Sequence, residues 1–100
     1  MRYSVRDNHA VFYFSGELDH AASDGIRRLI DRVITENQSV RHVIFDFSRL
    51  SFMDSSGIGV ILGRYKRVVQ RGGDVRICNA SKAVERILAM SGIYSVVLKG

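Results

Sequence analysis

Residues 43–70 read VIFDFSRLSFMDSSGIGVILGRYKRVVQ, and this run decides the fold. It opens with a strand-like apolar segment, Val43 to Phe47, and closes with Ile58 to Gln70, where apolar residues recur at helical spacing. Between these segments lies the polar turn Asp54-Ser55-Ser56-Gly57. The turn therefore places two hydroxyls and a carboxylate where a helix begins. Free main-chain N–H groups and a partial positive charge make such a place tolerant of a phosphate.

Similar elements lie on both sides of this run. Polar and apolar residues alternate in Arg2 to Arg6, as in an edge strand. The turn signal Asp7-Asn8 then predicts that Val11 to Ser15 returns antiparallel in a hairpin. The other predicted elements are a helix from the cap Asp19 to about Asn37, a strand from Asp74 to Cys78, a helix from the cap Ser81 to Gly92 and a strand from Tyr94 to Leu98. The predicted order is β-β-α-β-α-β-α-β.

This order predicts one α/β domain over residues 1–100. Strands that are separated by helices run parallel through right-handed crossovers, so only the N-terminal edge strand is expected to be antiparallel. Sites in such sheets usually lie beyond the carboxyl ends of the parallel strands. We therefore expect Gly16-Glu17-Leu18-Asp19 and the serine turn to meet at that edge of the sheet.

Composition narrows the class of protein. The 100 residues are 46% hydrophobic, which suits a packed domain, and no apolar run approaches the ~18 residues of a membrane span. Nothing at the start resembles a signal peptide. The single cysteine, Cys78, allows no disulfide within the chain, so we expect a cytoplasmic protein.

The formal net charge of +5 raises the question of a nucleic-acid partner. The basic residues are expected on the outer faces of two helices, Arg27, Arg28 and Arg32 on one and Arg64, Lys66, Arg67 and Arg71 on the other. No exposed aromatic ladder for stacking bases accompanies them. We interpret them as a solvated basic surface.

Motifs for catalysis are weak. Gly57-x-Gly59 fails the dinucleotide fingerprint because Leu62 occupies the third glycine position, and neither serine lies in a Gly-x-Ser-x-Gly elbow. The histidines lack metal-ligand spacing. A triad of Ser55, His20 and either Asp54 or Asp19 is conceivable. Because no substrate pocket is evident, we expect a protein that is not an enzyme and that needs no metal or cofactor.

Gly59 and Gly63 lie four residues apart in the predicted helix, and each weakens it by up to about 1 kcal/mol relative to alanine. Either a partner approaches that face closely or the glycines pack tightly on the sheet, and the sequence leaves both explanations open.

Three blocks of the chain resemble the anti-sigma factor antagonists, which carry a STAS domain, and the members of the sporulation sigma-F pathway in particular. The blocks are Gly16 to His20 (GELDH), Leu50 to Gly57 (LSFMDSSG) and Gly59 to Lys66 (GVILGRYK). The resemblance covers nearly the whole chain in the same order, and the serine-bearing block is its most specific part. Ala21 departs from the family, which often has a second histidine here, and the family's C-terminal helix is expected to be absent.

The resemblance implies a protein-binding switch. In that family the unphosphorylated antagonist binds an anti-sigma factor, which is also a serine kinase, and so releases a sigma factor. The kinase phosphorylates the serine that corresponds to Ser55, and a PP2C-type phosphatase reverses this. The resemblance implies no direct nucleic-acid or membrane partner.

The residues of the turn have alternative roles. Ser55 is either the phosphoacceptor or a plain helix cap, Ser56 is the cap or a support, and Asp54 orients the hydroxyl or holds the turn. Asp19 and His20 are expected to contact the partner, and Asp19 also to cap its helix. Gly57 either allows close approach of the partner or only permits a tight turn.

Two other functions stay open at this point. One is another STAS protein, either a general-stress antagonist or a scaffold of a sensory complex. The other is a small nucleotide-binding domain that uses the helix start at Ser55 for phosphate, although a glycine-rich cradle is missing.

Overall fold

A five-stranded sheet runs through the structure, and its strands lie side by side in the order in which they occur along the chain. The first two strands pair antiparallel, and every other neighbouring pair is parallel. The structure is a computed structural model that describes residues 1–100. Its elements are β1 (Arg2–Arg6), β2 (His9–Leu18), α1 (His20–Glu36), β3 (His42–Met53), α2 (Ser55–Gln70), β4 (Asp74–Cys78), α3 (Lys82–Ser91), the 3-10 helix η1 (Ile93–Ser95) and β5 (Leu98–Lys99). The predicted fold class and element order are confirmed.

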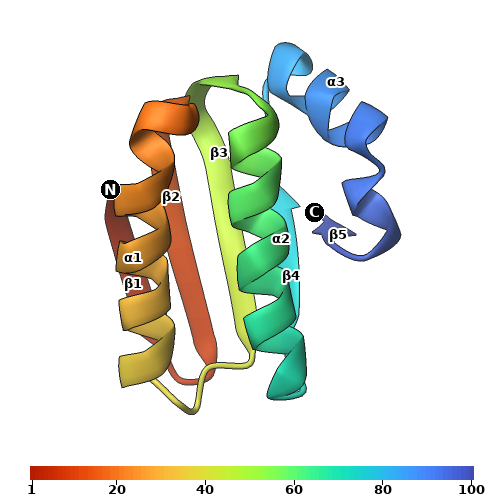
Figure 1. Cartoon of the computed structure of the whole chain (residues 1–100). Helices are drawn as coiled ribbons and strands as arrows, with labels where there is room; N and C mark the ends of the chain where they lie inside the picture. Colours follow the sequence, from red (N-terminus) through yellow and green to blue (C-terminus); the bar gives the residue numbers. More distant parts are fainter.

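Two helices cover one face of this sheet. In Figure 1, α1 and α2 lie side by side in front of the strands, while α3 lies beyond them at the β4 side. Four buried phenylalanines of β2 and β3 fill the space beneath the helices, and Phe14 meets Phe47 edge-on with ring centroids 4.9 Å apart. Burying each such ring contributes about 1.5–3 kcal/mol. The phenylalanines are part of a single hydrophobic core that also includes buried residues of both helices.

Both central strands are longer than the sequence pattern indicates. We expected them to end at Ser15 and Phe47, but β2 runs to Leu18 and β3 to Met53. The alternation of apolar and polar residues breaks near these positions, but the two strands stay paired through register shifts. One shift lies between Tyr13 and Ser15 and the other between Gly16 and Glu17. Gly16 has a left-handed backbone (φ 74°), which favours glycine.

The last strand is present as predicted, but its predicted bounds, Tyr94 to Leu98, are wrong. Gly92 ends α3 in a left-handed conformation, as expected, but η1 follows at once, and only Leu98–Lys99 pairs with β4. Ile93 and Val97 are buried and lie four residues apart, which is the spacing of a helical turn. The apolar run therefore packs as a turn rather than as a strand.

The basic residues of α2 are only partly a solvated surface. Arg64 was expected on the outer face, but it is buried between the helices, where its Nε lies 2.8 Å from Asp31 Oδ1 of α1. Burial lowers the pKa of the Arg64 guanidinium, and the Asp31 carboxylate opposes that shift. Arg71 donates to the carbonyl oxygens of Ile34 and Asn37 at the end of α1 and of Val40 in the loop that follows it. Both arginines therefore join the two helices.

Candidate functional site

The serine turn is a capped helix start. Asp54, whose backbone is extended, is the N-cap of α2, and its Oδ1 accepts a hydrogen bond from the Ser56 N–H at 2.8 Å. Its carbonyl oxygen accepts from the Gly57 N–H at 3.0 Å. Ser55 is thus the first helical residue and Ser56 the second, and α2 starts three residues before the predicted Ile58. Of the alternatives for the two serines, the role of helix cap is wrong for both, since the Asp54 carboxylate one residue before the helix already caps it.

The other helix start has the same design. Asp19 is the N-cap of α1, and its Oδ1 accepts from the Ala22 N–H at 2.9 Å, which confirms the predicted cap. The Ser23 hydroxyl donates to the Asp19 carbonyl oxygen at 2.6 Å. His20 is the first residue of α1 and is exposed.

The two helix starts lie on one edge of the sheet, as expected. Leu18 and Met53, the last residues of β2 and β3, are register partners. The N–H of Asp54 donates to the Leu18 carbonyl oxygen at 3.4 Å. These links bring the Gly16–Asp19 segment and the serine turn together.

The two serines differ in exposure. Ser55 is exposed, whereas Ser56 is half-buried and lines a groove of about 280 Å³ between α1 and α2. Gly59 and Arg27 also line this groove. The Ser55 hydroxyl is therefore accessible to another protein without a rearrangement of the helix start. Ser56 is less accessible, because it lies in the groove between the helices.

The glycines of α2 fall into two kinds. A Cβ at Gly57 would lie 2.5 Å from Met53 Cγ and 3.0 Å from Leu18 Cγ, so Gly57 allows the helix to sit closely on the strands. A Cβ at Gly59 or Gly63 would meet nothing within 4 Å. Tight packing on the sheet therefore does not explain Gly59 and Gly63, and the explanation by close approach of a partner is left.

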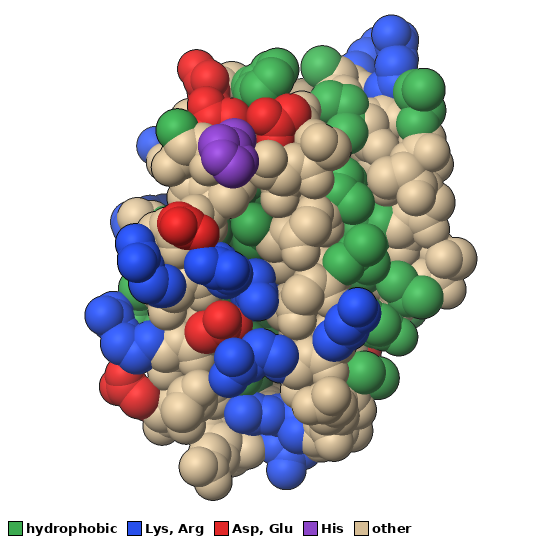
Figure 2. All heavy atoms as spheres, in the orientation of Figure 1, with side chains coloured by type: hydrophobic (Ala, Val, Ile, Leu, Met, Phe, Trp, Pro, Cys, Tyr) green, Lys and Arg blue, Asp and Glu red, His purple; other side chains and the backbone are tan.

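Charge is unevenly distributed over the helical face. Figure 2 shows Asp and Glu side chains and a His side chain at the upper end, where both helices begin, and Lys and Arg side chains gathered further down. The capping carboxylates Asp19 and Asp54 belong to this upper end. The surface around Ser55 is thus locally acidic, although the chain as a whole is basic.

One residue near the site was not singled out from the sequence. Phe52, at the end of β3, exposes 47% of its surface beside the turn, while its neighbour Met53 is buried. A lone exposed phenylalanine is ordinary, but one beside a candidate binding edge adds apolar area to it. Strand alternation extended to Met53 is the signal that would have found it.

Comparison with known proteins identifies the family. The STAS domain model matches residues 1–99, so the chain belongs to the STAS domain family. The chain is 46% identical over 87 residues to the anti-sigma F factor antagonist of Paenibacillus polymyxa, an alignment that covers 87% of this chain and 74% of that protein. Within the STAS family it thus falls among the anti-sigma factor antagonists, which confirms the resemblance.

Solved structures agree with this assignment. The anti-sigma factor antagonist SpoIIAA in its unphosphorylated form superposes with a TM-score of 0.76 at 32% identity, over 99% of this chain and 86% of that one. The Bacillus cell fate determinant SpoIIAA in the phosphorylated form superposes with a TM-score of 0.75 at 33% identity, over 99% of this chain and 89% of that one. In the present structure, no helix combines the length and the apolar character that a membrane crossing requires.

Proposed function

We propose that this chain, as one STAS domain over residues 1–100, is an anti-sigma factor antagonist that is switched by phosphorylation of Ser55. The unmodified form binds an anti-sigma factor of the sigma-F type and so releases the sigma factor. The observation that carries the proposal is the exposed Ser55 hydroxyl on the first residue of α2, beside a second capped helix start. The existence of SpoIIAA in both unphosphorylated and phosphorylated forms supports it.

The helix start tolerates the modification. A phosphate adds about −1.5 to −2 charges at neutral pH. At the N-terminus of a helix that charge is favourable by roughly 0.3–2 kcal/mol, so the fold survives. For a bound partner the phosphate is unfavourable, because it adds negative charge and bulk to a surface that already carries the Asp19 and Asp54 carboxylates. Each tenfold loss of affinity needs only about 1.4 kcal/mol, so local repulsion and crowding suffice for a switch.

The residues of the edge have separate roles in this proposal. His20 and Phe52 are exposed and contact the anti-sigma factor, together with the outer atoms of Asp19, Asp54 and Ser56. The two aspartates also hold their helix starts in place. Gly57 is buried, so it acts by seating α2 against Met53 and Leu18 rather than by presenting surface.

The switch requires other proteins to supply the chemistry. The anti-sigma factor acts as a serine kinase and transfers a phosphoryl group from ATP to the Ser55 hydroxyl, and a PP2C-type phosphatase removes it by hydrolysis. The chain itself is then a regulatory binding protein that catalyses neither step and holds no cofactor. Membership of the anti-sigma factor antagonists supports this division of labour.

Release of the sigma factor tests the proposal directly. The chain is titrated into a fluorescently labelled complex of sigma F with its anti-sigma factor, and sigma release is followed by anisotropy. We expect release by the unmodified chain, no release by the chain phosphorylated on Ser55, and normal release by Ser56→Ala as the matched control. Equal release by both phosphorylation states would contradict the switch.

The same assay separates the alternatives. Release from an anti-sigma-B complex but not from the sigma-F complex would assign the chain to the general-stress antagonists. Binding to neither complex would favour a scaffold function. Tight ATP binding by the chain without any kinase would favour a nucleotide-binding domain.

A further inference from the structure

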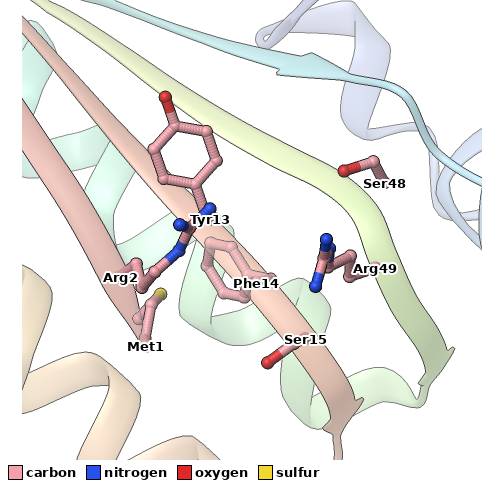
Figure 3. Close-up of a pocket in the computed structure, with 7 residues that line it drawn as sticks. All are labelled: Met1, Arg2, Tyr13, Phe14, Ser15, Ser48 and Arg49. Carbon is pink, nitrogen blue, oxygen red and sulfur yellow. The ribbon is translucent and has the colours of Figure 1, made fainter.

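A second pocket lies away from the helical face, where β1, β2 and β3 run together. It has a volume of about 240 Å³ and is lined by Met1, Arg2, Tyr13, Phe14, Ser15, Ser48 and Arg49. In Figure 3, the Arg2 and Arg49 side chains extend toward each other from β1 and β3, on either side of β2. Ser55 and its helix contribute nothing to this pocket.

The pocket is a product of an irregular pairing. Tyr13 pairs with Asp46, but Ser15 pairs with Arg49, so β3 has one residue more than β2 between these two points. Such a bulge bends a strand and re-aims its side chains. Here it brings Ser48 and Arg49 to the same pocket as Tyr13 and Ser15.

The two guanidinium groups of the pocket have no acidic partner. The ion pairs of the structure involve other basic residues, and neither Arg2 nor Arg49 takes part in one. Arg2 lies over the Tyr13 ring, 5.2 Å from its centroid, which holds it at the pocket. The carboxylate of Asp46 does not line the pocket. It accepts hydrogen bonds from the Ser48 N–H and from Asn79.

We propose that this pocket binds a small phosphate, either as the free anion or as a compact phosphate ester. A guanidinium fork matches two oxygens, so one arginine satisfies a carboxylate, whereas two arginines on opposite sides suit an anion with more oxygens. The charge of a phosphate also balances two guanidinium groups. The Ser15 hydroxyl can donate to a remaining oxygen. The volume lies below the roughly 300–1,000 Å³ of pockets for drug-sized ligands, so the ligand is small.

The test is a titration of the ¹⁵N-labelled full chain, followed by amide chemical shifts at constant ionic strength. The probes are inorganic phosphate, phenyl phosphate and benzoate. We expect saturable shifts at Arg2, Tyr13, Ser15, Ser48 and Arg49 with phosphate or phenyl phosphate. Arg49→Gln should weaken this binding about tenfold or more, because a hydrogen bond to a charged group is lost.

Matched variants make the result specific. Arg86→Gln removes an equal charge from an exposed position on α3 and should leave the affinity unchanged, as should Ser55→Ala. Tighter binding of phenyl phosphate than of inorganic phosphate would identify an ester as the ligand, and the reverse would identify the free anion. Equal loss in Arg49→Gln and Arg86→Gln, equally tight binding of benzoate, or the lack of saturable shifts would overturn the proposal.

Discussion

The main-chain N–H of Asp54 donates to the carbonyl oxygen of Leu18 at 3.4 Å, and this contact joins the starts of α1 and α2. Leu18 precedes Asp19, the cap of α1, and Asp54 itself caps α2. One main-chain contact therefore aligns two capped helix starts on the same edge. The two segments therefore have a fixed position relative to each other for a partner that recognises both, and the Ser55 hydroxyl lies in the first turn of α2, directly after the cap.

Replacing Asp54 with alanine should lower the free energy of unfolding by about 1 kcal/mol, because the Ser56 N–H loses its acceptor. Asp54→Asn keeps an acceptor oxygen and should stay within a few tenths of a kcal/mol of the parent. Urea denaturation followed by circular dichroism measures both. Equal stabilities for the alanine and asparagine variants would show that the cap contributes nothing.

Gly57→Ala and Gly59→Ala should have opposite effects. The new methyl at position 57 would press on Met53 and Leu18, so we expect a destabilisation of about 1–3 kcal/mol. At position 59 it would meet nothing, and alanine should stabilise the helix by up to about 1 kcal/mol. Thermal unfolding of the two variants compares them directly. If Gly59 admits a close partner, Gly59→Ala should also weaken binding of the anti-sigma factor while it raises stability.

Asp31→Asn should lower the free energy of unfolding by more than the loss of a surface ion pair does. Arg64 exposes only 8% of its side chain, and without Asp31 its charge is left buried and uncompensated. Breaking a buried pair in this way costs about 3 kcal/mol. Arg32→Gln, which removes the exposed pair with Glu36, should cost no more than about 0.5 kcal/mol. Similar unfolding midpoints in urea for the two variants would contradict a structural role for Arg64.

The raised pKa of Tyr94 predicts that the stability of the fold depends on pH in the alkaline range. Burial and the hydrogen bond to Glu85 raise the pKa of Tyr94 above its ordinary value of 10.0. The folded state therefore favours the neutral phenol, so this contribution to stability is complete below pH 10 and is lost as the pH rises toward the folded pKa. Stability between pH 9 and 11 should fall less steeply in Tyr94→Phe than in the parent. Tyr3→Phe, at an exposed position, should follow the parent curve.

The parts of the fold that the sequence predicts are those with local causes. Asp19 and Ser81 cap their helices and Gly92 ends α3, because capping depends on a few adjacent residues. The order of strands and helices followed from the periodicity of apolar residues. Ser55 was predicted at a helix start because it follows a strand-like run and precedes a run with helical spacing, and in the structure it is the first residue of α2.

The features that could not be predicted from the sequence depend on contacts between residues far apart along the chain. The extension of β2 and β3 past their polar residues is stabilised by pairing across the two strands, which periodicity along one strand does not show. Arg64 looked like a surface residue because its buried partner, Asp31, lies on another helix. Ile93 and Val97 resembled part of a strand, since short apolar runs suit either a strand or a helical turn.

Intact-mass analysis after incubation with ATP and an anti-sigma F factor kinase tests directly whether Ser55 is the switch. The parent chain should gain one phosphate, Ser56→Ala should gain one, and Ser55→Ala should gain none. A known substrate of the kinase, run in parallel, shows that the enzyme is active. A phosphate on Ser55→Ala, or none on the parent while the known substrate is modified, would contradict Ser55 as the switch.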